Sequence, residues 1–305
     1  MAAAAAMVAS ALLATVGEAR RFGRLAVGAT NILFTSPCGL AVAYANLQPI
    51  LPGHILVAPT RAEGTEHMSD LTTEELDALF ATVHSVQEVY GPSLGATAHN
   101  LAIHDGACAG QPTLLPHAHV HVVPRVPGDL ANNDEVYERV QRWSPDGPAT
   151  TPPPFHIPTD EERKPRTAAT MAEEACRYHV AAAEGPGGGS EALPAPTFGF
   201  GPKIQLDSSQ LFYASALSVA SVNLKPLCPG HVLVIPRRCV QYMGELTEAE
   251  RVDLWRTVRT VQEVVCRVHG AKGCKIGVQD GRDAGQSVAH VHVHLLPQAQ
   301  RAGAE

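Results

Sequence analysis

Two stretches of this chain have the same histidine pattern. Residues 117–124 read HAHVHVVP, and residues 290–297 read HVHVHLLP. Side chains alternate between the two faces of a β-strand, so histidines at positions i, i+2 and i+4 are expected on one face, each about 6–7 Å from the next. Three imidazoles in a row pack poorly in a core and suit a metal ion or a phosphate. The doubled pattern predicts two related domains.

The repeat extends far beyond the histidines. Residues 45–59 match residues 222–236, and both segments contain an Asn-x-x-Pro turn followed by Pro-Gly-His and an apolar run. Residues 68–72 match 243–247, and residues 86–89 match 261–264. The first copy has two extra residues just before its triad.

Each copy predicts an α+β domain. Thr72 with Glu75, and Thr247 with Glu250, have the spacing of a capping box at the start of a helix with apolar residues at helical spacing. Strands are expected at 55–58 and 232–235, at 97–104 and 274–279, and over both triads. Strands that flank a single helix predict an antiparallel sheet of about five strands in each domain.

The repeat also places the domain boundaries. We expect an N-terminal extension at 1–20, a first domain at 21–143, a linker at 144–196 and a second domain at 197–305. Seven prolines between residues 144 and 166 exclude a packed element there. A helix is expected at about 167–183, before a flexible Gly-rich stretch at 185–190.

Composition narrows the function. The net charge is −7, without a cluster of Lys or Arg, which argues against binding to nucleic acid. Seven cysteines without a CxxC pair argue against a disulfide framework or a cysteine zinc site, and favour a reducing, cytoplasmic location. An Ala-rich start followed by Arg20, Arg21 and Arg24 leaves a mitochondrial location as the alternative. No membrane-spanning segment is expected.

These residues together resemble the histidine triad (HIT) superfamily, and within it the fragile histidine triad branch of dinucleoside polyphosphate hydrolases. The resemblance rests on residues 223–236, on residues 278–297 and on residues 128–137 after the first triad. It covers nearly everything from Arg21 to Pro297 except the proline-rich segment. HxHxH alone is a weak motif; preceded by Gly-Gln-Ser, with Pro-Gly-His some 60 residues upstream, it is a strong one.

The resemblance implies hydrolysis at an α-phosphate through a covalent nucleotidyl-histidine. A neutral imidazole is a good nucleophile near pH 7. His292 would be the nucleophile, His290 and His294 would support it and hold phosphate oxygens, and His231 would complete the site. The substrate-binding residues implied in the second copy are Asn223 for the ribose, and Gln279, Gly285, Gln286, Ser287 and Val288 for the polyphosphate.

The first copy departs from this pattern. It keeps the counterparts of the histidines and two of the binding residues: His119 as nucleophile, His117, His121, His54, Asn46 and Gln111. His104 stands where the second copy has Gln279, and Pro112 replaces Ser287, which removes a hydroxyl and a backbone N–H. We therefore expect the second site to be competent and the first to be weak, altered in specificity or structural.

The same resemblance sets the expected cofactors and partners. No tightly bound metal is implied; Mg²⁺ or Mn²⁺ would accompany a nucleotide substrate. Fragile histidine triad proteins are homodimers that join two sheets. We therefore expect the two copies to make that contact within one monomeric chain, as an intramolecular pseudo-dimer.

Other interpretations remain open. The triads could bind zinc. Gln286 and Ser287 could form a turn without binding substrate, and Asn46 and Asn223 could be present because Asn is common in Pro-containing turns. Trp143 and Trp255 are expected to pack rather than stack on bases. The rival enzymes are a nucleoside phosphoramidase of a related branch and, less favoured because its triad ends in Gln, a galactose-1-phosphate-type nucleotidyltransferase. A slow dinucleotide sensor is the rival from another class.

Overall fold

The computed structural model describes residues 20–112, 115–145, 158, 162–185 and 190–299. The N-terminal extension before Arg20, most of the proline-rich segment and part of the Gly-rich linker lie outside the described residues. No helix in the described ranges is both long and apolar enough to span a membrane.

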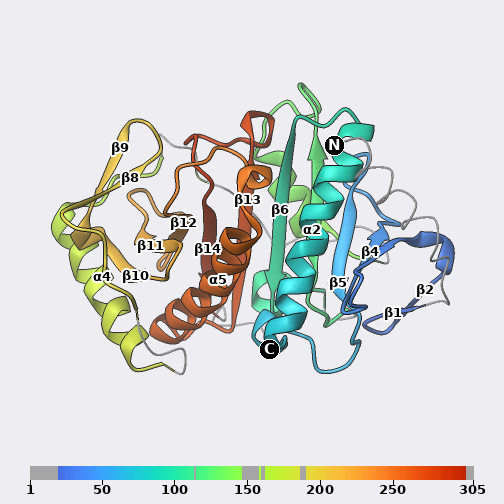
Figure 1. Ribbon diagram of the computed structural model, residues 1–305, viewed down its shortest axis with the longest axis horizontal. Helices are drawn as coiled ribbons and strands as arrows, with labels where there is room; N and C mark the ends of the chain where they lie inside the picture. Colours follow the sequence, from blue (N-terminus) through green and yellow to red (C-terminus); the bar gives the residue numbers. More distant parts are fainter. Residues whose placement is uncertain (1–19, 113–114, 146–157, 159–161, 186–189, 300–305) are drawn as a thin grey trace.

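The core of the molecule is one ten-stranded antiparallel sheet, to which each copy contributes five strands (Figure 1). Its strand order is β10-β11-β12-β14-β13-β6-β7-β5-β4-β3. The first copy supplies β3 (Ile32–Thr35), β4 (Ala41–Ala45), β5 (Ile55–Pro59), β6 (Ala98–Asp105) and β7 (Val120–Arg125). The second supplies β10 (Leu211–Ala214), β11 (Ser218–Val222), β12 (Val232–Pro236), β13 (Gly273–Asp280) and β14 (Val293–Gln298).

Small elements surround this sheet. Two-stranded sheets lie at its two ends: β1 (Arg20–Phe22) with β2 (Leu25–Val27), and β8 (Thr197–Phe200) with β9 (Ile204–Asp207). Short 3₁₀ turns are η1 (Ala29–Asn31), η2 (Met68–Asp70), η3 (Ala107–Ala109), η4 (Ser208–Gln210), η5 (Met243–Glu245) and η6 (Arg282–Ala284). The α+β prediction of two similar domains is confirmed.

The two long helices lie side by side on one face of the sheet (Figure 1). They are α2 (Thr73–Ser93) and α5 (Glu248–His269). Both begin with the expected capping box, in which Thr72 and Thr247 accept from the backbone N–H of Glu75 and Glu250. The apolar faces of both helices are buried against one face of the sheet. The triads therefore lie toward the other face of the sheet.

The copies meet along β6 and β13, which pair antiparallel from Cys274 opposite Asp105 to Asp280 opposite His99. The two ends of this register are equivalent: replacing each residue of the pair Cys274–Asp105 by its counterpart in the other copy gives the pair His99–Asp280. Such a symmetric pairing is that of an isologous homodimer interface. Above it Phe80 of α2 stacks on Trp255 of α5, with ring centroids 3.6 Å apart. The two copies therefore form a pseudo-dimer within one chain, and Trp255 packs as expected.

Two reciprocal hydrogen bonds support this join from the helices. Gln87 Nε2 donates to Asp280 Oδ2 at 3.0 Å, and Gln262 Nε2 donates to Asp105 Oδ2. Each aspartate belongs to the Asp-Gly turn of the opposite copy. The helix of one domain thus fixes the turn that precedes the triad of the other.

The helix expected in the linker is α4 (Ala168–Ala183), with Thr167 as its N-cap. The helix α4 is not an unpacked connection between the two domains. Met171, Ala175 and Tyr178 are buried, and the Tyr178 ring lies 5.0 Å from that of Phe212 on β10. This helix therefore belongs to the packing of the second copy.

The triads differ from their expected setting on a strand. Strands β7 and β14 begin only at Val120 and Val293, so of each triad only His121 and His294 lie in the ladder. The preceding residues bond elsewhere, because Ala118 N donates to Thr65 O and Val291 N donates to Val240 O. The first two histidines of each triad therefore sit on an extended segment that leaves the sheet.

Candidate active site

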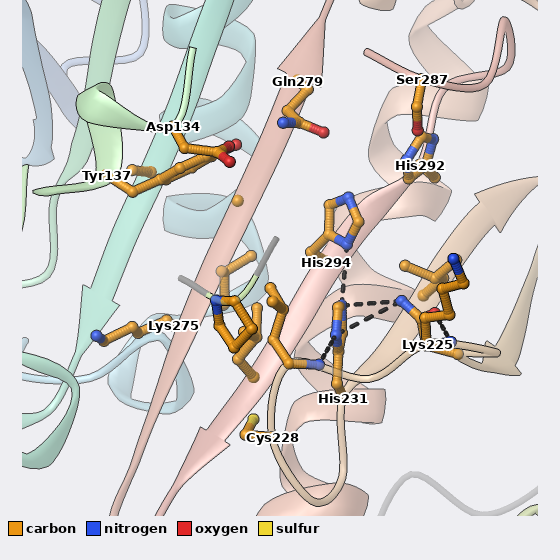
Figure 2. A pocket seen from close by; sticks show the side chains of 18 of the residues that line it. Asp134, Tyr137, Lys225, Cys228, His231, Lys275, Gln279, Ser287, His292 and His294 are labelled. Carbon is orange, nitrogen blue, oxygen red and sulfur yellow. Dashed lines mark hydrogen bonds between the residues drawn. The ribbon is translucent and has the colours of Figure 1, made fainter. Parts of the chain in front are cut away.

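A cavity of about 550 Å³ opens beside the second triad, on the sheet face opposite α2 and α5 (Figure 2). It lies over β14, β13 and β6 and so crosses the boundary between the copies. Its volume falls in the range of small-molecule sites. Seven expected residues line it: Asn223, His231, Gln279, Ser287, Val288, His292 and His294.

His292 is held in one tautomer by the backbone. Its Nδ1 lies 2.8 Å from the carbonyl oxygen of His290. A carbonyl only accepts, so in the neutral ring Nδ1 carries the hydrogen and Nε2 carries the lone pair. The acceptor that the sequence did not reveal is thus the main chain two residues back, and Nε2 of His292 is left as the nucleophilic atom.

A second chain of hydrogen bonds fixes His294 in the opposite sense. Leu227 N–H donates to Nδ1 of His231 at 3.1 Å, so the hydrogen of His231 resides on Nε2. That Nε2 lies 3.0 Å from Nδ1 of His294 and donates to it. His294 therefore carries its own hydrogen on Nε2, and the site combines a nucleophilic nitrogen on His292 with an N–H donor on His294.

Burial keeps these rings neutral. Desolvation lowers the pKa of His292, lowers the pKa of His231 to about 3 and holds the pKa of His294 well below its ordinary value. Arg163 adds to the effect on the pKa values of His231 and His294. At neutral pH the middle histidine is unprotonated, as a nucleophile requires.

His290 does not have the expected role as a phosphate ligand. Its Nε2 donates to the Pro236 carbonyl at 2.9 Å, and its Nδ1 accepts from Gly201 N–H at 3.0 Å. With both nitrogens engaged and the side chain fully buried, the imidazole does not reach the cavity. Its contribution to His292 comes through its carbonyl oxygen instead.

Gln286 is likewise a brace and not a cavity donor. Its Oε1 accepts from Gly281 N–H at 3.1 Å, and its Nε2 donates to Gln241 O at 2.9 Å. Gln111 makes the matching bonds to Gly106 and Glu66 in the first copy. Both glutamines therefore hold the turn before the triad, which is the turn interpretation left open for Gln286.

Gly285 shapes the site without lining it. It adopts a φ of +90°, and a Cβ placed there would lie 2.8 Å from Nε2 of Gln279. Any side chain at this position would therefore displace an amide that faces the cavity.

Sequence reasoning missed the positive charge of the cavity. Lys225, Lys275 and Arg163 line it, although they are far apart in the sequence. Lys275 could have been found, because in β13 it alternates with Gly277 and Gln279 on the face away from the helices. Arg163 lies in the proline-rich segment, where no periodic pattern exists; it donates to Lys225 O at 3.1 Å.

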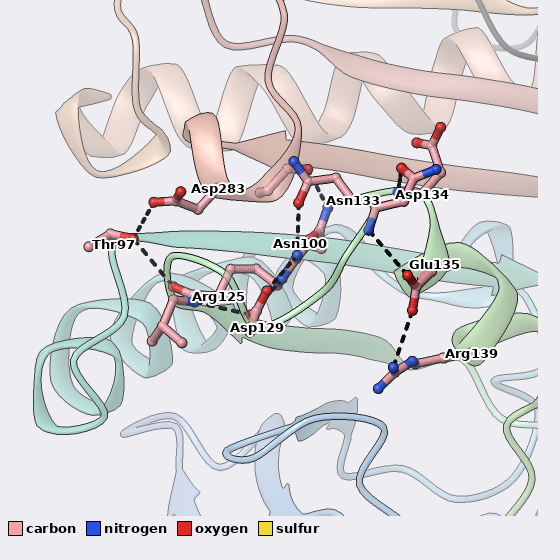
Figure 3. A network of polar contacts seen from close by, with 12 residues as sticks. Thr97, Asn100, Arg125, Asp129, Asn133, Asp134, Glu135, Arg139 and Asp283 are labelled. Atoms are coloured by element: carbon pink, nitrogen blue, oxygen red, sulfur yellow. Dashed lines mark hydrogen bonds and ion pairs between the residues drawn. The ribbon is translucent and has the colours of Figure 1, made fainter.

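The first copy supplies the far wall of the cavity. Asp134, Tyr137 and Gln141 line it from α3 (Glu135–Arg142) and the residue before that helix. The loop that leads into α3 is held by fully buried Arg125, whose Nη1 donates to Asn100 Oδ1 at 2.7 Å and whose Nη2 donates to Asp129 and Asn133 (Figure 3). Asn100 also donates to Ala284 O in the second copy at 3.0 Å. One network thus ties this wall to the turn of the second site.

The first triad repeats the bonding of the second. His119 Nδ1 lies 2.7 Å from His117 O, and His54 Nε2 lies 3.0 Å from His121 Nδ1. Burial lowers the pKa of His54 to about 3 and that of His119 to about 4. The first copy thus brings together most of its expected site residues: His54, His119, His121, Asn46 and Gln111. His117 instead bonds to Pro59 O and Thr65 and supports the loop.

The surroundings of the first triad nevertheless differ, because Trp143 lies directly on it. The indole centroid is 4.9 Å from the His121 ring and 5.6 Å from the His119 ring. Its Nε1 lies 3.0 Å from Gln48 O and 3.3 Å from Asn46 Oδ1. Trp143 packs, as expected, but it packs on the first site.

The doubled antiparallel sheet, with a histidine triad in each copy and a cavity beside the second, defines a tandem histidine-triad fold, and comparison with known proteins gives the family. The HIT domain profile matches residues 30–128 and 206–301. The chain belongs to the HIT domain family.

Curated relatives match one segment of the chain. The bis(5'-nucleosyl)-tetraphosphatase (asymmetrical) of Schizosaccharomyces pombe is 56% identical over 89 residues, which cover 29% of this chain and 49% of that protein. The bifunctional bis(5'-adenosyl)-triphosphatase/adenylylsulfatase of Arabidopsis thaliana is 46% identical over 101 residues, 33% of this chain and 56% of that protein. The chain thus spans about half the length of these relatives.

Solved structures match most of the chain at low sequence identity. A GalT-like protein from Arabidopsis thaliana aligns with 89% of this chain and 80% of its own, at a TM-score of 0.53 and 13% identity. At this identity the likeness concerns the fold alone.

Proposed function

We propose that the second copy hydrolyses dinucleoside polyphosphates, such as diadenosine tri- or tetraphosphate, through a nucleotidyl-histidine at His292. One observation carries the proposal: Nδ1 of His292 is hydrogen-bonded to the His290 carbonyl, so the Nε2 lone pair is the atom left to attack. The names of the relatives from Schizosaccharomyces pombe and Arabidopsis thaliana support the substrate class.

The reaction has two steps. Nε2 of His292 attacks the α-phosphorus, an N–P bond forms, and the P–O bond to the departing nucleotide breaks. A water molecule then attacks the same phosphorus and the N–P bond breaks; the water oxygen stays on the nucleoside monophosphate, its surplus proton leaves to solvent, and neutral His292 is restored. Because the leaving group is a nucleotide, strong acid catalysis is not needed.

The remaining residues act on charge and position. The Nε2–H of His294 donates to a non-bridging oxygen whose negative charge grows in the transition state. Ser287 and Gln279 are neutral donors at the cavity wall, and Lys225, Lys275 and Arg163 complement the polyphosphate charge. We expect the substrate to arrive with Mg²⁺ or Mn²⁺, which neutralises part of that charge; no resident metal is proposed.

The test is a substrate panel. Turnover of diadenosine triphosphate, diadenosine tetraphosphate and an adenosine phosphoramidate is measured for the wild type and for His292→Asn. We expect the dinucleotides to be preferred, and the variant to lose about 10³-fold or more in kcat. Denaturing the protein during turnover of a radiolabelled substrate traps the covalent intermediate. We expect the label on the peptide that contains His292, as a nucleotidyl group bound to the histidine.

Two results would overturn the proposal. Preference for the phosphoramidate would assign the chain to the rival phosphoramidases. Tight dinucleotide binding with a kcat far below about 1 s⁻¹ would favour the sensor.

A further inference from the structure

The first triad is assembled yet sealed. His119 has the same backbone-fixed tautomer as His292, with Nδ1 bonded to His117 O. Its Nε2 is buried, and no described residue offers it a hydrogen bond. A buried nitrogen without a partner is energetically unfavourable, so such an atom points to a function or to a missing ligand. Nε2 of His292, which lines the open cavity, is not in this state.

Both copies pack a phenylalanine edge-on against the middle histidine, Phe22 at 5.3 Å and Phe200 at 5.2 Å, so Trp143 is the additional ring packed on the first triad. Its side chain is 7% exposed, and the indole lies edge-on to His121 and tilted over His119. The indole N–H also points to Asn46 Oδ1. A flat aromatic ring with an N–H directed at this asparagine takes both the volume and the hydrogen bond that a nucleoside would use.

The helix that carries Trp143 is firmly seated on the first copy. Val136 and Val140 of α3 are buried, and Arg139 Nη1 donates to Ile50 O at 3.1 Å. Trp143 is the C-cap residue, so its position follows from the seating of α3. The same short helix therefore closes the first triad at its end and lines the second cavity with Tyr137 and Gln141.

We propose that the first triad is a latent nucleotide site that Trp143 holds shut. Its ligand is a nucleoside monophosphate, held by Asn46 and by the phosphate-facing nitrogens of His119 and His121. Gln48 and Asn100 stand where the second copy has Lys225 and Lys275. Arg125 stands where the second copy has Gln298, but it is paired with Asp129, so the opened site has less free positive charge and suits a single phosphate better than a polyphosphate chain.

The ligand class rests on the proposed function of the second copy, so the test counts sites separately. Equilibrium dialysis with radiolabelled adenosine monophosphate gives the number of sites per chain. We expect one site in the wild type, two in Trp143→Ala and one in Trp143→Phe, which keeps a ring in place. Adding Asn46→Leu to Trp143→Ala should return the number to one.

The outcomes separate the two proposals. A folded Trp143→Ala variant that still binds one nucleotide overturns the latent site and leaves the second site intact. A wild type that binds no adenosine monophosphate and does not turn over the dinucleotides overturns the proposed function instead.

Loss of a buried indole is destabilising, so a measurement on the unaltered protein completes the test. Diethyl pyrocarbonate acylates accessible imidazole nitrogens, and peptide mass spectrometry locates the product. We expect His292 to be modified, to be protected by adenosine monophosphate, and to react at least tenfold faster than His119. Equal rates at the two histidines would show that Trp143 does not seal the first site.

Discussion

The clearest quantitative prediction concerns Asp280, whose carboxyl group is buried where the two copies join. Burial raises its pKa from 3.8 to about 6, with Glu245 and Glu88 adding to the rise, although Met243 N–H and Gln87 donate to it. The folded chain therefore holds this proton to a higher pH than the unfolded chain does.

The sign and size follow from linkage. Between pH 3.8 and about 6 the folded state binds more protons than the unfolded state, so the free energy of unfolding falls as the pH rises. A shift of roughly two units corresponds to about 3 kcal/mol, which is fully lost above pH ~6.5. Asp280→Asn removes this titration. In the variant, Oδ1 of the new asparagine still accepts from Met243 N–H. Its NH₂ group donates to Oε1 of Gln87 once the Gln87 amide has rotated by half a turn.

The assay is urea unfolding of wild type and Asp280→Asn at several pH values. We expect the stability difference to change by about 2.5 kcal/mol in favour of the variant between pH ~4 and pH ~7.5, because the unfolded aspartate is already partly ionised at pH ~4. Lost hydrogen bonds would add a constant offset but no slope. Asp283→Asn, in the same turn and only partly buried, is the matched control. A flat difference for Asp280→Asn, or the same slope in both variants, would refute the argument from burial.

Four further predictions concern the site and the pseudo-dimer. The acid limb of the pH–rate profile should lie below pH 6.5, because burial lowers the pKa of His292 and the neutral ring persists to lower pH; a limb above 6.5 contradicts this. His292→Asn should abolish turnover while His119→Asn retains at least half of it, and equal losses would end the proposed asymmetry. Trp255→Ala removes the ring stacked on Phe80 and should lower the free energy of unfolding by about 3–5 kcal/mol, measured in urea. Light scattering should give 32.2 kDa, the mass of one chain, and not twice that value.

Much of this architecture could be predicted from local patterns. The repeat indicated two similar domains, the Thr-x-x-Glu spacing indicated where both main helices begin, and seven of the residues expected at the second site line the cavity. The helix starts were accessible because they depend on neighbours within a few residues, and the domains because the same motifs occur twice along the chain.

What the sequence did not reveal depends on contacts between distant segments. The direction of the His290 side chain follows from the segment leaving the sheet at Val291, which a strand pattern does not show. The position of Trp143 on the first triad follows from the packing of α3 on the first copy, which the sequence pattern does not show. Arg163 reaches the cavity from a segment without periodicity.

The β6–β13 join also explains how the two sites came to differ. In a homodimer every substitution appears twice, so a residue that plugs one site plugs both. Here the same isologous register is made by two separately encoded halves, and Pro112, which stands where the second copy has Ser287, changes one half alone. Covalent fusion thus relieves the chain of exact symmetry, and α3 of the first half lines the second cavity while its C-cap residue, Trp143, lies on the first triad.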